Sequence, residues 1–158
     1  MKIASKLKDY LQQRGIEYRV VTHPHSEYSM ETAEKAHVSG DALAKGVLVK
    51  DDEGYLLVVT PADFHIELKS LQRLLGQEVS MVDEPALGEV FADCELGAVP
   101  PIGMAYGVKT IWDPQSSLGK LDEVYFEAGD HQTLVRMSGE HFHELMAPAE
   151  RARFSHHV

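Results

Sequence analysis

The sequence contains one cysteine, Cys94, among 158 residues. A lone cysteine excludes an internal disulfide and is typical of proteins from a reducing compartment. No apolar run approaches the roughly 18 residues of a membrane helix. The first residues, MKIASKLKDYLQQRG, lack the continuous apolar core of a signal peptide. We therefore expect a cytoplasmic protein without a membrane partner.

Positive charge is scarce as well, because 15 Lys and Arg residues stand against 25 Asp and Glu residues and give a formal net charge of −10. A negative field opposes non-specific binding to a long nucleic-acid backbone. DNA is therefore not an expected partner. The same charge still permits recognition of a small local feature, such as the end of an RNA.

Several common catalytic and cofactor motifs are missing, namely HExxH, CxxC, the P-loop, the GxGxxG fingerprint and the GxSxG elbow. Two histidine pairs, His23 with His25 and His141 with His143, look like metal ligands. Side chains two positions apart on a helix diverge by about 200°, so the second pair is poorly placed to share one ion. We expect neither a metal nor a cofactor.

The composition, with 44% hydrophobic and 25% charged residues, is that of one globular domain. We assign residues 1–150 to this domain and residues 151–158 to a flexible C-terminal tail. Helical periodicity is found at 3–15, 29–38, 68–76 and 139–146, with a helical turn from Pro85. Strand patterns are found at 16–22, 42–50, 55–60, 78–82, 107–112, 123–128 and 133–138. This order lacks regular βαβ alternation and predicts an α+β domain with a mixed or antiparallel-rich sheet.

Lys45 opens the first strand of a hairpin, ALAKGVLVKDDEGYLLVVT, in which two apolar runs flank a DDEG turn. Because side chains alternate along a strand, Lys45 shares a face with Val47 and Val49, which is the face expected to be buried. The common interpretation is a lysine whose ammonium reaches water beyond an apolar stem. The functional interpretation is an ammonium at a pocket wall, facing an anion or a developing oxyanion. The strand pattern leaves both open.

The loop CELGAVPPIG, residues 94–103, is the second candidate site. Gly97 permits a close approach of the backbone to a ligand, and Pro100 and Pro101 stiffen the segment that follows. Such a loop could hold a carbonyl oxygen with its amides, although a plain surface turn explains the same pattern. Cys94 raises the alternative of a thiol nucleophile, which its acidic neighbours disfavour because they raise a thiol pKa.

Three segments in order carry a family resemblance: ALAKGVLVKDDEGYLLVVTPAD, DCELGAVPPIG and VYFEAGDHQTLVRMSGEHFHEL. They resemble the YbaK and prolyl-tRNA synthetase editing-domain family of aminoacyl-tRNA deacylases, and the resemblance covers nearly the whole chain. It implies a curved mixed sheet surrounded by helices. It also implies that Lys45 is the family's essential lysine, and that Gly97 and Pro101 are the ends of its GxxxP loop, which positions the aminoacyl carbonyl.

The reaction implied by the resemblance is hydrolysis of the ester between a wrong, small amino acid and the 3′ end of a tRNA. Backbone amides near Gly97 would stabilise the oxyanion, and the ribose hydroxyl of the substrate would help to activate water. We expect Pro100, Thr22, Thr60 and Ala62 to line the substrate pocket together with Pro101.

The net charge of −10 indicates that a synthetase or an elongation factor contributes tRNA affinity. Two alternatives stay open. One is a non-catalytic binding module of the same fold for a nucleotide or an aminoacyl-tRNA. The other, ranked lower, is a hydrolase that depends on Cys94.

Overall fold

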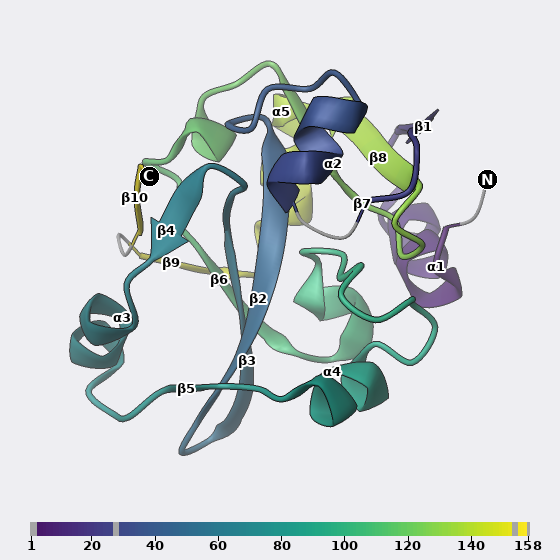
Figure 1. Cartoon of the computed structure of the whole chain (residues 1–158). Coiled ribbons are helices and arrows are strands. Elements are labelled where there is room, and N and C mark those ends of the chain that lie inside the picture. The colour runs from purple at the N-terminus through teal and green to yellow at the C-terminus, as the bar shows by residue number, and fades with distance from the viewer. Residues whose placement is uncertain (1–2, 27–28, 153–154, 158) are drawn as a thin grey trace.

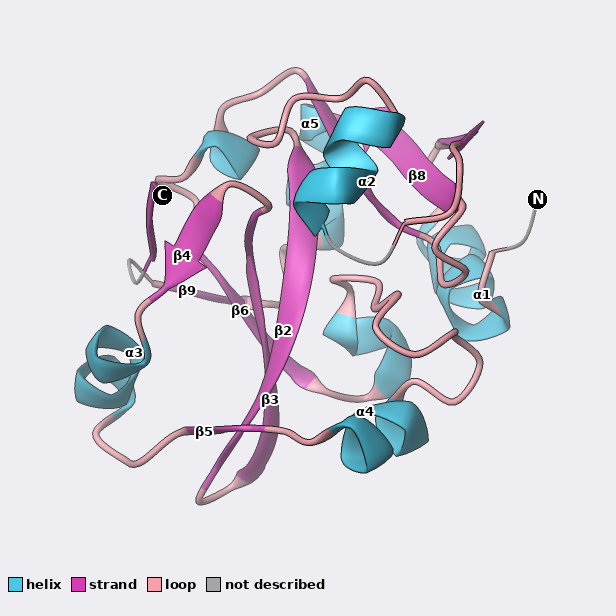
Figure 2. Ribbon diagram, in the orientation of Figure 1, coloured by secondary structure: helices cyan, strands magenta, loops and turns pink. Residues whose placement is uncertain are grey.

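The structure is a computed structural model that describes residues 3–26, 29–152 and 155–157 (Figure 1). The described residues form an eight-stranded sheet in the order β1-β8-β7-β2-β3-β6-β9, with β5 also pairing with β2, and a separate sheet of β10 and β4. The large sheet contains both antiparallel and parallel pairs. Helices lie around these sheets (Figure 2). The predicted α+β class with a mixed sheet is confirmed.

The helices are α1 (Ser5–Arg14), α2 (Ser29–Lys35), α3 (Leu68–Leu75), α4 (Glu84–Val90) and α5 (Gly139–Leu145), with 3-10 turns η1 (Gly103–Tyr106) and η2 (Ser117–Gly119). The strands are β1 (Arg19–Thr22), β2 (Leu43–Asp51), β3 (Gly54–Pro61), β4 (Phe64–Ile66), β5 (Ser80–Met81), β6 (Lys109–Trp112), β7 (Glu123–Glu127), β8 (Thr133–Ser138), β9 (Glu150–Arg151) and β10 (Ser155–His157).

Local sequence explains where several helices begin and end. The first helix ends at Gly15, whose backbone N–H donates to the Gln12 carbonyl at 3.1 Å. The last helix begins after Ser138, whose Oγ accepts from the His141 N–H at 3.1 Å. The predicted helices at both ends of the chain are therefore confirmed.

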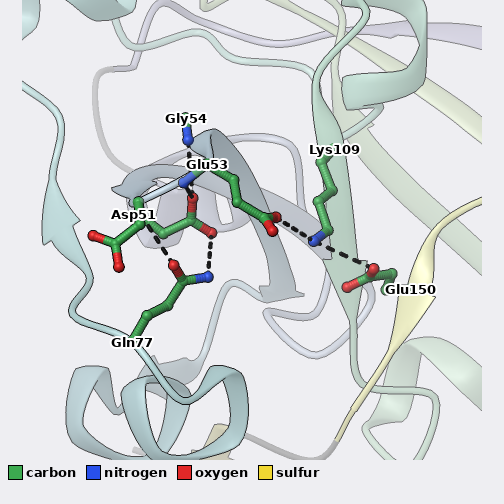
Figure 3. A network of polar contacts seen from close by, with 7 residues as sticks. Asp51, Glu53, Gly54, Gln77, Lys109 and Glu150 are labelled. Carbon is green, nitrogen blue, oxygen red and sulfur yellow. Dashed lines mark hydrogen bonds and ion pairs between the residues drawn. The ribbon is translucent and has the colours of Figure 1, made fainter.

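Hydrogen bonds and ion pairs hold the tip of the β2–β3 hairpin (Figure 3). Asp51 Oδ1 accepts from the backbone N–H groups of Glu53 at 2.8 Å and Gly54 at 3.0 Å. The Lys109 ammonium lies 3.6 Å from a Glu53 carboxylate oxygen and 3.4 Å from one of Glu150. These contacts connect the tip to β6 and β9. They keep the two long strands in the register that the DDEG turn predicts.

Apolar side chains pack on both faces of the large sheet. One face carries the main core, in which Leu7 of α1 and Phe142 of α5 share a cluster with Phe126 of β7. On the opposite face, Ala33 of α2 packs in a cluster with Leu43 of β2. Figure 1 shows α2 at one end of β2, and the shared cluster of Ala33 and Leu43 places this helix over that end of the strand.

Three short strands, β4, β9 and β10, were not expected from the sequence. Strand β4 follows β3 closely and pairs antiparallel with β10, which lies in the segment assigned to the C-terminal tail. Strand β9, Glu150–Arg151, pairs with β6 at the boundary of that segment. The flexibility of residues 151–158 stays a prediction. No helix in residues 3–26, 29–152 and 155–157 has the length and apolar character needed to cross a membrane.

Candidate functional site

Lys45 is held in one place by backbone carbonyls. Its Nζ donates to the Phe64 carbonyl at 2.8 Å and to the Ala62 carbonyl at 3.3 Å. Burial lowers the pKa of Lys45, and the Asp63 carboxylate opposes part of that shift. Thr60 is the cross-strand partner of Lys45 and lies fully buried on the same face. The predicted residues Thr60 and Ala62 therefore lie beside Lys45.

The loop of residues 97–101 reaches β2 at the residue next to Lys45. A Cβ added to Gly46 would stand in tight contact with the Pro101 Cα, at 3.2 Å, so the two backbones approach each other closely here. Pro100 and Pro101 are buried, whereas Gly97 is exposed and has φ 85°, in the left-handed region. The loop is thus anchored at its proline end and accessible at its glycine end.

Few backbone donors are available in this loop. The amide of Ala98 already donates to the Glu95 carbonyl at 3.0 Å, and prolines carry no N–H. Within residues 97–101, the amides of Gly97 and Val99 are therefore the ones without a hydrogen bond among the described residues.

An unpaired stretch of strand edge lies between Lys45 and the loop. The parallel pairing of β2 with β7 ends at Ala44 and Phe126, and the pairing of β2 with β5 begins only at Val49. Between these points no strand of the described residues pairs with this edge of β2. The Leu48 carbonyl on this edge accepts from the Val82 N–H at 3.4 Å, so the open part is β2 residues 45–47, which we call the notch.

Lys45 and the loop of residues 97–101 lie on opposite faces of the sheet at the notch. Because side chains alternate along a strand, Lys45 leaves β2 on the face opposite the one where Pro101 contacts Gly46. A ligand that touches both the ammonium and the loop backbone therefore has to lie across the open edge, where no neighbouring strand separates the two faces.

His131 lies at the other end of the loop and was not identified from the sequence. A Cβ on Gly97 would stand 3.6 Å from His131 Cε1, and His131 Nε2 lies 2.6 Å from the Leu96 carbonyl oxygen. His131 is buried, with φ 60°, in the turn between β7 and β8. The loop therefore spans from the β7–β8 turn to β2. The sequence marks His131 only as a turn residue.

Glu127 is the second residue that sequence reasoning missed. The Thr32 hydroxyl of α2 donates to Glu127 Oε1 at 3.2 Å, and Ser26 Oγ lies 2.5 Å from Thr32 Oγ1. Burial raises the pKa of Glu127 to about 7, with His131 acting in the opposite direction. In the sequence, Glu127 follows the alternation of an exposed strand face, so the pattern carries no indication of burial.

Thr22 lies apart from Lys45 in the sheet. It is the last residue of β1, is exposed and pairs with Thr133. Strands β8 and β7 lie between β1 and β2. The sheet therefore does not bring Thr22 to Lys45. Among the described residues, no group of three or more His, Cys, Asp or Glu side chains is placed to hold a metal ion.

Cys94 belongs to a hydrogen-bonded group with Asp93 and Tyr106. Its Sγ lies 3.4 Å from Asp93 Oδ1 and 3.4 Å from the Tyr106 hydroxyl, which itself donates to Asp93 Oδ1 at 2.8 Å. Burial raises the pKa of the Cys94 thiol to about 12. A thiol is a poor nucleophile when it stays protonated at neutral pH.

We expect Cys94→Ser to retain turnover within about twofold of the unmodified protein, because a protonated thiol contributes no nucleophile. The measurement is the rate of amino-acid release from aminoacyl-tRNA under single-turnover conditions. Loss of activity in a variant with an unchanged melting temperature would instead support the thiol mechanism.

The family model described as "Aminoacyl-tRNA editing domain" matches residues 23–145 of this chain. The chain belongs to this family. The matched range contains Lys45, the loop of residues 97–101, Glu127 and His131. The predicted relationship to the YbaK and prolyl-tRNA synthetase editing domains is confirmed, and with it the function of an aminoacyl-tRNA deacylase.

A curated relative from Escherichia coli strain K12 is the "Multifunctional Ser/Thr-tRNA deacylase ProXp-y". It is 29% identical over 126 residues, which cover 75% of this chain and 73% of that protein. The protein of the same name from Escherichia coli O157:H7 matches this chain with the same identity and coverage.

Solved structures support the fold. A protein reported as a candidate trans-editing enzyme for prolyl tRNA synthetase has a TM-score of 0.80 at 22% identity, covering 97% of this chain and 96% of that one. A scaffold protein used for computational epitope backbone grafting has a TM-score of 0.80 at 23% identity, covering 98% and 97%. These likenesses establish that both solved structures share the fold of this chain.

Proposed function

We propose that the notch is the active site, in which the ester of a mischarged tRNA lies between Lys45 and the backbone of residues 97–101. The observation that carries this proposal is the course of the loop, which runs from His131 to Gly46, the residue that follows Lys45 in β2. The loop therefore lines the unpaired edge along which an extended acyl ester can lie.

The two walls of the notch have different chemical roles. The Gly97 and Val99 amides are the donors that would stabilise the tetrahedral oxyanion, as preorganised backbone donors do in acyl-transfer sites. The ammonium of Lys45, fixed by two carbonyls, would hold the terminal phosphate or ribose region or add to that stabilisation. The ribose hydroxyl of the substrate would assist the attacking water.

The preferred substrates are small. Ser and Thr esters are the first candidates, because the Escherichia coli relative is named for them. The buried Thr60 hydroxyl has no hydrogen-bond partner among the residues that the structure describes, and it lies beside Lys45, where a substrate hydroxyl could bind it. We also propose cytoplasmic editing in trans, with a synthetase or an elongation factor increasing tRNA affinity, because the net charge is −10.

The test is a deacylation panel of seryl, threonyl, alanyl and cysteinyl esters on non-cognate tRNAs, with added chelator as a control. We expect release of at least one small amino acid, unaffected by the chelator. Saturable binding without turnover across the panel would support the binding module and overturn the proposed hydrolase. A lower KM in the presence of a synthetase would support the partner.

A further inference from the structure

Glu127 lies on β7, the strand whose pairing with β2 ends where the notch begins. The parallel strands β2 and β7 are in register at Leu43 and Tyr125, and Lys45 and Glu127 each follow two residues later on the same face. Lys45 and Glu127 therefore leave neighbouring strands on the same face of the sheet, and the Lys45 ammonium reaches toward β3, where it donates to the Ala62 and Phe64 carbonyls. Helix α2 lies over this face, where Thr32 donates to Glu127 Oε1.

The second carboxylate oxygen of Glu127 has no partner. Oε2 is buried and makes no hydrogen bond with any described residue. A buried carboxylate without a donor or a cation is strongly disfavoured. Thr32 is neutral, and the charged groups that act on Glu127 are His131 and Asp130 of the β7–β8 turn, with opposite effects. The site thus lacks one positive group next to Oε2.

An aminoacyl ester carries the group that this site lacks. Its α-ammonium is bonded to the carbon next to the scissile carbonyl, and its tRNA part is anionic. A ligand whose acyl end lies on the β7 side of the notch places this α-ammonium toward the Glu127 carboxyl group, and the two opposite charges attract.

We propose that Glu127 accepts a hydrogen bond from the α-ammonium of the bound aminoacyl group, so that the site selects acyl groups with a free α-amino function. This inference rests on the proposed function, because it assigns a role within the same site. It names the substrate class as α-amino esters, in contrast to α-hydroxy or N-blocked esters of the same size.

Binding of two stable probes separates this role from catalysis. The first is 3′-(L-serylamino)-3′-deoxyadenosine, in which an amide replaces the ester, and the second carries a hydroxyl in place of the α-amino group. By titration calorimetry near neutral pH, we expect the unmodified protein to bind the amino probe about tenfold to a hundredfold more tightly, as charged hydrogen bonds typically allow.

Glu127→Gln keeps the shape of the side chain and removes its charge, so we expect it to abolish the preference between the two probes. The matched control is Glu123→Gln on the same strand and face, which should retain the preference because Glu123 is exposed and pairs with Arg136. Melting temperatures verify that both variants are folded. The preference of the unmodified protein is measured without any variant.

Several results would overturn the inference. These are equal affinity of the unmodified protein for both probes, no binding of the amino probe at millimolar concentration, or a preference that survives Glu127→Gln. A carboxylate that acts only as a base for water would lower turnover in the variant and leave both affinities unchanged. A clear amino preference without deacylation of any tRNA would uphold the anchor and reject the proposed hydrolase.

Discussion

Replacing Lys45 with Met is expected to lower kcat/KM for deacylation by about a hundredfold or more, the usual scale for loss of a preorganised charge-stabilising group. The thioether side chain keeps the length of the stem but cannot donate to the Ala62 and Phe64 carbonyls. The ammonium that faces the acyl ester would be absent. The measurement is single-turnover hydrolysis of the best ester in the deacylation panel.

Lys50→Met is the matched control for this experiment. Lys50 lies on the same strand, is exposed, and pairs with Tyr55 and Ser80 at the far end of the hairpin. We expect its turnover to stay within about twofold of the unmodified protein, since surface substitutions have small effects. Equal activity in both variants would mean that Lys45 has a structural role only and would remove one wall from the proposed site.

Replacing Gly97 with Ala is expected to lower turnover by at least about tenfold. The residue has φ 85°, and a left-handed conformation costs an ordinary residue about 1–2 kcal/mol. The nearest side-chain atom would stand at 3.6 Å, on His131, so there is no steric clash to force a larger change. The loop can relieve the strain only by rotating its backbone, which moves the Gly97 amide away from the notch.

Gly76→Ala separates this effect from general strain. Gly76 follows α3 with φ 68°, and an added Cβ would meet nothing within 4 Å. Both variants should lose similar thermal stability, but only Gly97→Ala should lose turnover. If Gly97→Ala and Gly76→Ala were equally active, the loop would not hold the reacting carbonyl, and the oxyanion donors would have to be sought elsewhere.

Lys45 and the loop of residues 97–101 differ in how far the sequence alone could predict their positions. Lys45 and its neighbours Thr60 and Ala62 belong to one hairpin, and the short DDEG turn determines which residues of its strands face each other. Their proximity follows from about 20 residues of sequence, as the observed register shows. The contact of Pro101 with Gly46 joins segments about 55 residues apart, and no local pattern encodes it.

Glu127 and His131 show why part of the site was missed. Their segment was correctly predicted as a hairpin, yet its alternation indicates only which side chains share a face. Whether that face is covered depends on α2, which is separated from β7 by about 90 residues and donates through Thr32. For Thr22, the sequence suggested a pocket position because the residue ends a strand. In the sheet, strands β8 and β7 lie between β1, which carries Thr22, and β2.

The sequence by itself determined the helices and the longer strands, the α+β class, the register of the long hairpin and the order of the motifs that relate this chain to editing domains. Each of these depends on periodicity and turn chemistry within short windows. Only the tertiary structure decided that β2 pairs in parallel with β7 and that this pairing stops at Ala44. Distant segments come together because they must bury their apolar faces on the same sheet. This packing brings the loop of residues 97–101 and Glu127 to the open edge of β2.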